Sequence, residues 1–388
     1  MKNFRTTPFV HVTYLWIATA CSSNSGASNA LSSSGGTEVA GQFGTSGGAA
    51  VGGHSAIGGT SGTAVSGGKP ATSSSSQPTV TPPSCKTSGP GTSDCGTDHE
   101  NCCTSIIVPG GTFFRTYTNE GSGAQGTADP ATITDFRLDK YLVTVGRFRK
   151  FVAAWNQGSG YAPPAGSGKH SHLNTGKGLA DGGAPGSYEQ GWVAADDTNI
   201  QITSDNLACD SSYATWTNTA SNQEDLPMNC VNWWEAYAFC IWDGGFLPSE
   251  AEFLYAAAGG SEQRKYPWGT PDAGANYQYA ICNCNYPDGS GSCSGVTNLA
   301  PVGTAQLGAG RWKHLDLVGD VTEWLLDWMS PSFANPCTDC ANVADGSGKV
   351  IRDGFYSGTD TTLLLSYRNS LYPSNRFASF GFRCARTP

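Results

Sequence analysis

The sequence is poor in positive charge, in histidine and in long apolar runs, and each scarcity argues against a class of function. Of 388 residues, 22 are Lys or Arg against 31 Asp or Glu, which leaves a formal net charge of −9. Nucleic-acid binding needs clustered cations that neutralise phosphates, so we expect no nucleic-acid partner. No apolar run of about 18 residues follows residue 25, so no spanning helix is expected in the mature chain. An HExxH motif, a nucleophile elbow and a P-loop are also missing from the sequence.

Cysteine, in contrast, is abundant. Fourteen cysteines are too many for a chain whose thiols stay reduced, and they favour an oxidising compartment. A metal-rich cytosolic protein is the alternative, but six histidines and the lack of paired zinc spacings oppose it. Four cysteines crowd into residues 85–105, which predicts a disulfide-stapled lead-in to a folded domain.

The N-terminus is typical of an export signal. Lys2 and Arg5 precede a moderately apolar run over residues 9–20, and small residues stand directly before Cys21. This pattern resembles a bacterial lipobox and predicts a signal peptide over residues 1–21. Cys21 would then carry a lipid that anchors the mature chain to a membrane of the bacterial cell envelope, on its periplasmic or outer surface. The alternative is a plain signal peptide and a secreted protein.

Residues 22–84 form a tract of Gly, Ser, Ala and Thr in which Phe43 is the single aromatic residue. Such a segment cannot bury enough apolar surface to offset its chain entropy, so we expect a disordered tether. Aromatic and aliphatic residues then recur steadily over 106–388. This composition predicts one folded domain at the C-terminal end of the tether.

Within that domain, capping signals predict helices that begin after Thr144, Asn232 and Ser249, the last two being followed by Glu at the third position. Apolar patterning predicts strands over 111–117, 131–138, 350–351 and 380–384. Residues 156–225 are polar and irregular. His170 and His172 lie there, and we expect an exposed pair without a ligand.

Four elements, the last of them made of two stretches, occur in a fixed order along the chain. They are TDFRLDKYLVTVGRFRKF (134–151), LPMNCVNWWEAYAFCIWDGGFLPSEAEFLYAAAGGSEQRKYPWG (226–269), LDLVGDVTEWLLDW (315–328), and the pair VIRDGFYSG (350–358) and GFRCAR (381–386). Together they resemble the signature elements of the formylglycine-generating, or sulfatase-modifying factor, family. The resemblance implies an α+β, loop-rich variant of the C-type-lectin-like fold, stapled by disulfides.

The resemblance also implies a disulfide between Cys240 and Cys384. Cys337 and Cys340 are spaced like a redox motif, but no Lys, Arg or His stands beside them to lower a thiol pKa. A structural bridge between these two is therefore the favoured interpretation. Of Cys282, Cys284 and Cys293, we expect two to pair and the third to remain an odd thiol.

The main departure from the family concerns its cofactor. Enzymes of the family oxidise a substrate cysteine at a copper(I) ion held by two cysteines, and soft thiolates suit that ion. Gly358 and Leu363 stand at the matching positions here. Copper is therefore not expected, and no catalytic residue can be assigned.

A second metal is implied by the resemblance. Asp320 and Glu323 match the family's structural calcium element, where hard oxygen ligands suit the ion. The alternative is that Glu323 binds an internal Arg. A further calcium site would use Asn276, although its acidic partner is replaced by Ser294.

These observations favour an exported, tethered protein that acts as a binding or scaffold module for a glycan or a protein. The alternative is a metal-dependent oxidase or protein-modifying enzyme of the same family, working through a site that the sequence does not reveal. A purely structural envelope protein is the third hypothesis. Fold resemblance alone cannot choose among them, because one scaffold can carry several functions.

Overall fold

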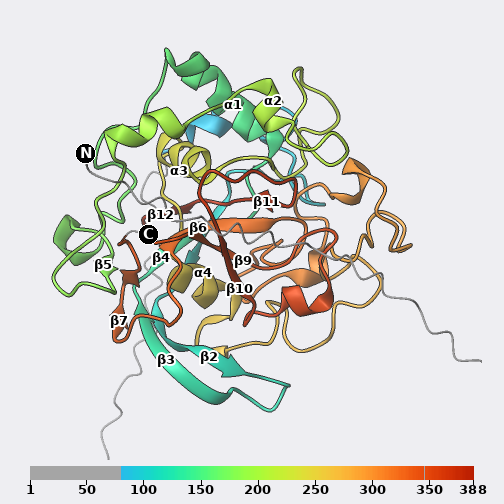
Figure 1. The fold of residues 1–388 in the computed structure, drawn as a ribbon. Helices are drawn as coiled ribbons and strands as arrows, with labels where there is room; N and C mark the ends of the chain where they lie inside the picture. Colours follow the sequence, from blue (N-terminus) through green and yellow to red (C-terminus); the bar gives the residue numbers. More distant parts are fainter. Residues whose placement is uncertain (1–79, 345) are drawn as a thin grey trace, which may run out of the picture. The chain divides into compact units, whose positions relative to one another are not determined.

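The computed structural model describes residues 80–344 and 346–388 (Figure 1). The predicted signal peptide, the predicted lipidation site Cys21 and nearly all of the predicted tether lie outside these residues. The last residues assigned to the tether belong to the folded domain. Ser84, assigned to the tether, is fully buried, and its backbone N–H donates to Asp243 Oδ1 at 2.9 Å.

The described part is a mixture of short helices and short strands joined by long loops, which confirms the predicted loop-rich α+β class. The helices are α1 (Val145–Trp155), α2 (Ser204–Leu207), α3 (Trp233–Trp242) and α4 (Glu250–Ala257). The strands are β1 (Ser105–Val108), β2 (Gly111–Thr118), β3 (Gln125–Ile133), β4 (Phe136–Asp139), β5 (Ala180–Asp181), β6 (Thr322–Trp328), β7 (Cys337–Thr338), β8 (Cys340–Ala341), β9 (Lys349–Arg352), β10 (Arg368–Leu371), β11 (Phe380–Gly381) and β12 (Ala385–Arg386).

The strands form four small sheets. The largest has the order β10-β9-β6-β11, with β6 antiparallel to β9 and parallel to β11. Two three-stranded sheets have the orders β1-β4-β12 and β2-β3-β7, and β5 pairs with β8. The long β2–β3 hairpin projects from the body of the domain, and β12 joins the last residues to the early strand β4 (Figure 1).

Local capping explains the three longer helices, as predicted. Thr144 accepts a hydrogen bond from the backbone N–H of Arg147 at the start of α1. Both α3 and α4 begin with a complete capping box, in which Asn232 and Ser249 each exchange hydrogen bonds with a Glu three residues later. These boxes satisfy donors that the first helical turn leaves free.

Two strand predictions are wrong in their bounds. The segment 131–138 is split between β3 and β4, which lie in different sheets. The break is a polar turn, because Thr134 donates to Asp339 from both its N–H and its hydroxyl, and Asp135 accepts from Gly110. Of the segment 380–384, only Phe380 and Gly381 are in a strand, β11, and β12 begins after its end, at Ala385.

Aromatic packing and disulfides hold the loops together. Phe148 of α1, Phe239 of α3 and Phe382 meet at ring-centroid distances between 5.4 and 6.3 Å. Both Cys240 and Cys384 lie in the same buried cluster. Large aromatic side chains stabilise a core strongly because each removes a large apolar area from water.

Six disulfides occur in the described residues. Two are the predicted bridges Cys240–Cys384 and Cys337–Cys340, and a third, Cys284–Cys293, leaves Cys282 as the odd thiol of its group. The lead-in holds Cys85–Cys103 and Cys95–Cys102, and the sequence reasoning missed Cys209–Cys230. In the part of the chain that the structure describes, every helix is too short or too polar to cross a bilayer.

Candidate functional site

The loop over residues 352–363 follows β9 and contains both positions where the family's copper ligands are expected. Arg352 fixes the start of this loop. The buried guanidinium of Arg352 donates hydrogen bonds to Glu250 Oε1 at 2.9 Å and to two backbone carbonyls at 3.0 Å. Asp353 follows with φ of 71°, in the left-handed region that favours glycine. Its carboxyl is 2 % exposed, and burial raises its pKa well above the usual value.

Neither expected copper position offers a metal ligand. Gly358 is buried in a tight turn, where its N–H donates to the carbonyl of Phe355 at 2.8 Å. A Cβ atom on Gly358 would lie 2.6 Å from Thr362 Oγ1. Leu363 is fully buried in an apolar cluster. These surroundings do not fit copper(I), whose soft ligands would have to be thiolates.

Cys282, the one unbridged cysteine among the described residues, is buried in the same cluster as Leu363. Burial raises the pKa of its thiol to about 12, and the charge of Asp360 adds to the shift. A thiol with such a pKa stays protonated near neutral pH, where it is a poor nucleophile and a poor metal ligand. Cys282 therefore does not replace the missing cysteine pair.

An open hollow of about 400 Å³ lies beside this loop. It is bordered by residues 274–275, by polar and glycine residues between Asn283 and Gly291, and by Asp360 of the loop itself. The backbone N–H of Asn283 donates to the carbonyl of Gly358 at 2.8 Å, which joins the wall of the hollow to the loop. This volume is within the range of ordinary small-molecule sites.

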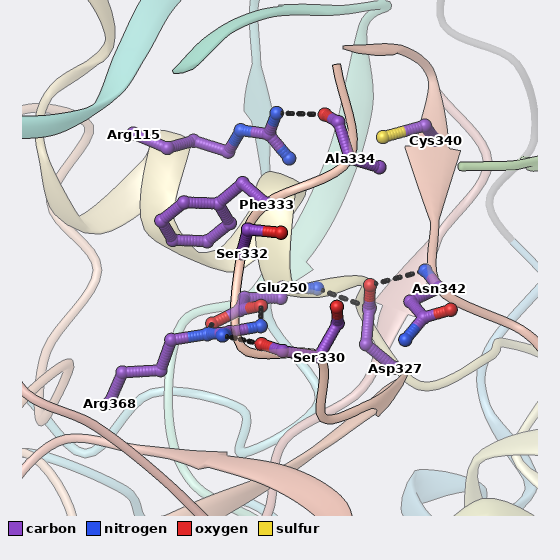
Figure 2. A pocket seen from close by; sticks show the side chains of 10 residues that line it. All are labelled: Arg115, Glu250, Asp327, Ser330, Ser332, Phe333, Ala334, Cys340, Asn342 and Arg368. Atoms are coloured by element: carbon purple, nitrogen blue, oxygen red, sulfur yellow. Dashed lines mark hydrogen bonds and ion pairs between the residues drawn. The ribbon is translucent and has the colours of Figure 1, made fainter. Parts of the chain in front are cut away.

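A second cavity has a volume of only about 20 Å³, room for about one water (Figure 2). Phe333 lines it, with the guanidinium groups of Arg115 and Arg368 each 4.7 Å from its ring centroid. Arg368 also forms a two-pronged ion pair with Glu250 at 2.6 and 2.7 Å. Figure 2 shows these side chains turned toward one another, so this cavity is part of a structural network.

Asp327 completes that network from β6. Its two carboxylate oxygens accept hydrogen bonds from the backbone N–H groups of Glu250 and Asn342, at 2.7 and 2.8 Å. Burial raises the pKa of Asp327 to about 7, and the nearby charge of Glu250 adds to the effect. Glu250 thus ties α4, β6 and the loop after β9 into one buried unit.

Of the residues predicted to bind calcium, Asp320 fits best. Asp320 is 1 % exposed, and its Oδ1 accepts a hydrogen bond from the backbone N–H of Ala300 at 3.2 Å. Its Oδ2 has no hydrogen-bond partner among the described residues. An unpartnered buried oxygen is costly unless a cation faces it. Burial raises the pKa of Asp320 well above its usual value, and Asp316 adds to the shift.

The other two predicted calcium ligands fit less well. Both carboxylate oxygens of Glu323 accept from Arg383 Nε, at 3.0 and 2.9 Å, which is the internal Arg pair foreseen as the alternative. Asn276 and Ser294 are both exposed. Within residues 80–344 and 346–388, no three His, Cys, Asp or Glu side chains are grouped to hold a metal ion. A calcium ion at Asp320 would therefore take most of its ligands from the backbone.

The prediction that His170 and His172 form an exposed pair is wrong for His170. His170 is fully buried, with Nδ1 3.0 Å from Glu189 and Nε2 3.0 Å from Glu252. Burial alone would lower its pKa, but attraction to the two carboxylates outweighs this and raises the pKa to about 10. His172 is half-buried, and neither ring nitrogen has a hydrogen-bond partner among the described residues. The His170 ion triad joins the long irregular segment to α4.

The sequence of this chain is similar to those of known proteins. Residues 92–388 match the family description "Sulfatase-modifying factor enzyme 1-like domain". A formylglycine-generating enzyme of Streptomyces coelicolor is 30% identical over 303 residues, covering 72% of this chain and 88% of that protein. The mouse protein named inactive C-alpha-formylglycine-generating enzyme 2 is 29% identical over 164 residues, 42% of this chain and 49% of its own length. The solved structure of PvdO from Pseudomonas aeruginosa covers 78% of this chain and all of that chain, at 22% identity and a TM-score of 0.46.

Proposed function

Because the chain belongs to the family of sulfatase-modifying factor enzyme 1-like domains, we propose that it keeps the family scaffold as a binding or scaffold module without copper oxidation. The observation that carries this proposal is the loop over 352–363, where Gly358 and Leu363 are buried and offer no thiolate. The free thiol nearest in the core, Cys282, is held protonated by burial. A mouse relative is itself named inactive, which gives the loss of chemistry on this scaffold a precedent.

The proposal places the domain outside the cytoplasm, in the cell envelope. Six disulfides support this location, because such a number persists only in an oxidising compartment. Lipid attachment at Cys21 and the Gly/Ser-rich tether would hold the domain at a membrane while leaving it free to reach a ligand. Secretion without a lipid anchor is the alternative.

A structural calcium ion is part of the same proposal. Asp320 would supply its carboxylate Oδ2, and backbone carbonyl oxygens would supply further ligands. The ion would neutralise a carboxylate that is otherwise buried without a partner. Its role would be to hold the loops around β6 in place, since calcium has no redox chemistry.

The test uses the purified, fully oxidised mature chain on arrays of glycans and peptides, together with its metal content by mass spectrometry after exposure to copper(I). We expect saturable binding to one ligand class and copper far below one equivalent. Tightly held copper at one equivalent would support the oxidase alternative. An absence of any saturable ligand would overturn the binding role.

A further inference from the structure

The hollow beside the loop over 352–363 has fixed walls. Asn285 is buried, with Oδ1 accepting from Cys282 at 3.2 Å and Nδ2 donating to the carbonyl of Ala280 at 3.0 Å. The backbone carbonyl of Asn285 accepts a hydrogen bond from the backbone N–H of Gly289 at 2.6 Å. The disulfide Cys284–Cys293 closes the same segment. Residues on this frame are therefore held in place before a ligand arrives, which lowers the entropy cost of binding.

Two side chains on the rim have hydrogen-bonding capacity that the protein does not use. Asn283 donates through Nδ2 to Asp360 Oδ1 at 3.1 Å, and both side chains are exposed. Among the described residues, Asp360 Oδ2 and Asn283 Oδ1 have no donor. One amide hydrogen of Asn283 also stays free. The pair thus presents two acceptors and one donor side by side.

The remaining lining narrows the ligand class. Among the described residues, no Lys, Arg or His lines the hollow, so a phosphate, sulfate or carboxylate group would find no counter-charge there. In the same part of the chain, Ala275 is the only lining residue with an apolar side chain, so an aliphatic or aromatic anchor would gain little from burial. The glycine-rich border lets a ligand approach the backbone closely. What this surface can satisfy is an uncharged molecule with neighbouring hydroxyl groups.

We propose that the hollow binds a neutral carbohydrate, with one sugar ring placing neighbouring hydroxyls on Asn283 and Asp360. This inference rests on the proposed binding function and names its ligand class. The hydroxyls would donate to Asp360 Oδ2 and Asn283 Oδ1, and the free amide hydrogen would reach a sugar oxygen. Hydrogen bonds to a charged acceptor are the stronger ones, so Asp360 would contribute more to affinity than Asn283.

Titration calorimetry on the full mature chain tests this, with maltotriose, mannotriose and triacetylchitotriose as neutral probes. Deacetylated chitotriose and trigalacturonate serve as cationic and anionic counterparts. We expect a neutral trisaccharide to bind, and Asp360→Ala to weaken it about tenfold or more, as loss of a hydrogen bond to a charged group does. Asn283→Ala should weaken it less. The control variants Asp98→Ala and Asn218→Ala alter exposed residues outside the hollow and should bind like wild type.

Three outcomes would overturn the inference: no neutral sugar binds, a charged trisaccharide binds better than the neutral ones, or Asp360→Ala and Asn283→Ala both bind like wild type. The first would leave the binding function standing if a peptide still bound saturably on the array. Circular dichroism on each variant separates loss of the site from loss of fold, and both substituted side chains are exposed.

Discussion

The buried triad of His170, Glu189 and Glu252 gives a sharp test of how the long irregular segment is attached. Replacing His170 by Ala removes the one cation that, among the described residues, pairs with these two carboxylates, whose side chains are each 3 % exposed. Breaking a buried ion pair from one side costs about 3–5 kcal/mol, because a charge is left buried and uncompensated. We therefore expect His170→Ala to lower the free energy of unfolding by about that amount near pH 7.

The stability of the variant should depend on pH with a definite sign. In the wild-type protein burial of Glu252 would raise its pKa, and attraction to His170 outweighs this and lowers it. Without the imidazolium, burial should raise the pKa of Glu252 above its unfolded value, so the folded variant binds more protons than the unfolded chain. Stability of the variant then falls as pH rises, and it should be lower at pH 8 than at pH 5. In wild type the pKa of His170 is itself raised to about 10, so its contribution is complete below pH 6.5 and disappears only as pH rises through 10.

The assay is equilibrium unfolding in guanidinium chloride followed by tryptophan fluorescence, with disulfides intact. His172→Ala is the matched control: it removes a half-buried ring without a hydrogen-bond partner. Its cost should be about 1 kcal/mol or less, the ordinary cost of a substitution that breaks no network. If His170→Ala cost under about 1 kcal/mol, or if the stability of the variant were equal at pH 5 and pH 8, the buried charged triad would be refuted.

Three further predictions follow from individual groups. Calcium should raise the unfolding temperature, with a stabilisation of about 2.7 kcal/mol when its concentration is a hundred times Kd. The Asp320→Ala variant should lose this response, and the Asp288→Ala variant, altered at an exposed residue, should keep it. Equal responses of the two variants would show that Asp320 does not bind the ion. Cys282 should be inert to a thiol reagent in the folded protein and give one equivalent for residues 80–388 after denaturation without reductant; reaction in the folded state would contradict its burial. Replacing Cys240 and Cys384 together by Ser should lower the free energy of unfolding by roughly 5 kcal/mol, because this bridge closes a sequence separation of 144 residues. If replacing Cys337 and Cys340 by Ser lowered it as much, loop closure would not be the main contribution of the Cys240–Cys384 bridge.

Local signals account for the parts of this fold that sequence reasoning placed well. The capping boxes at Asn232 and Ser249 are complete within four residues, so the starts of α3 and α4 need no tertiary information. Of the two glutamates that follow Ser249, Glu252 completes this box, whereas Glu250 pairs with Arg352 and Arg368, which lie far along the chain. The family resemblance added the Cys240–Cys384 bridge, which no local pattern reveals.

The missed features all depend on long-range contacts. His170 contacts Glu252, which lies 82 positions further along the chain. The residues that neighbour His170 in the sequence are polar, and they alone predict an exposed side chain. The strand break after Ile133 depends on Asp339, 205 positions beyond Thr134. The hollow combines residues 274–275 with Asp360. A single sequence indicates which residues can form such contacts, but not which of them the fold brings together.

We propose above all that this chain keeps the family scaffold without copper-dependent oxidation of cysteine. The most direct measurement incubates the oxidised mature chain with copper(I), oxygen, a reductant and a peptide containing Cys-x-Pro-x-Arg, and follows formylglycine by mass spectrometry. The formylglycine-generating enzyme of Streptomyces coelicolor serves as the positive control. We expect no product above a metal-free control, and none from a variant with Gly358→Cys and Leu363→Cys, because the new Cβ at 358 would crowd Thr362 and residue 363 faces the core. Copper-dependent turnover by the unaltered chain would contradict the account.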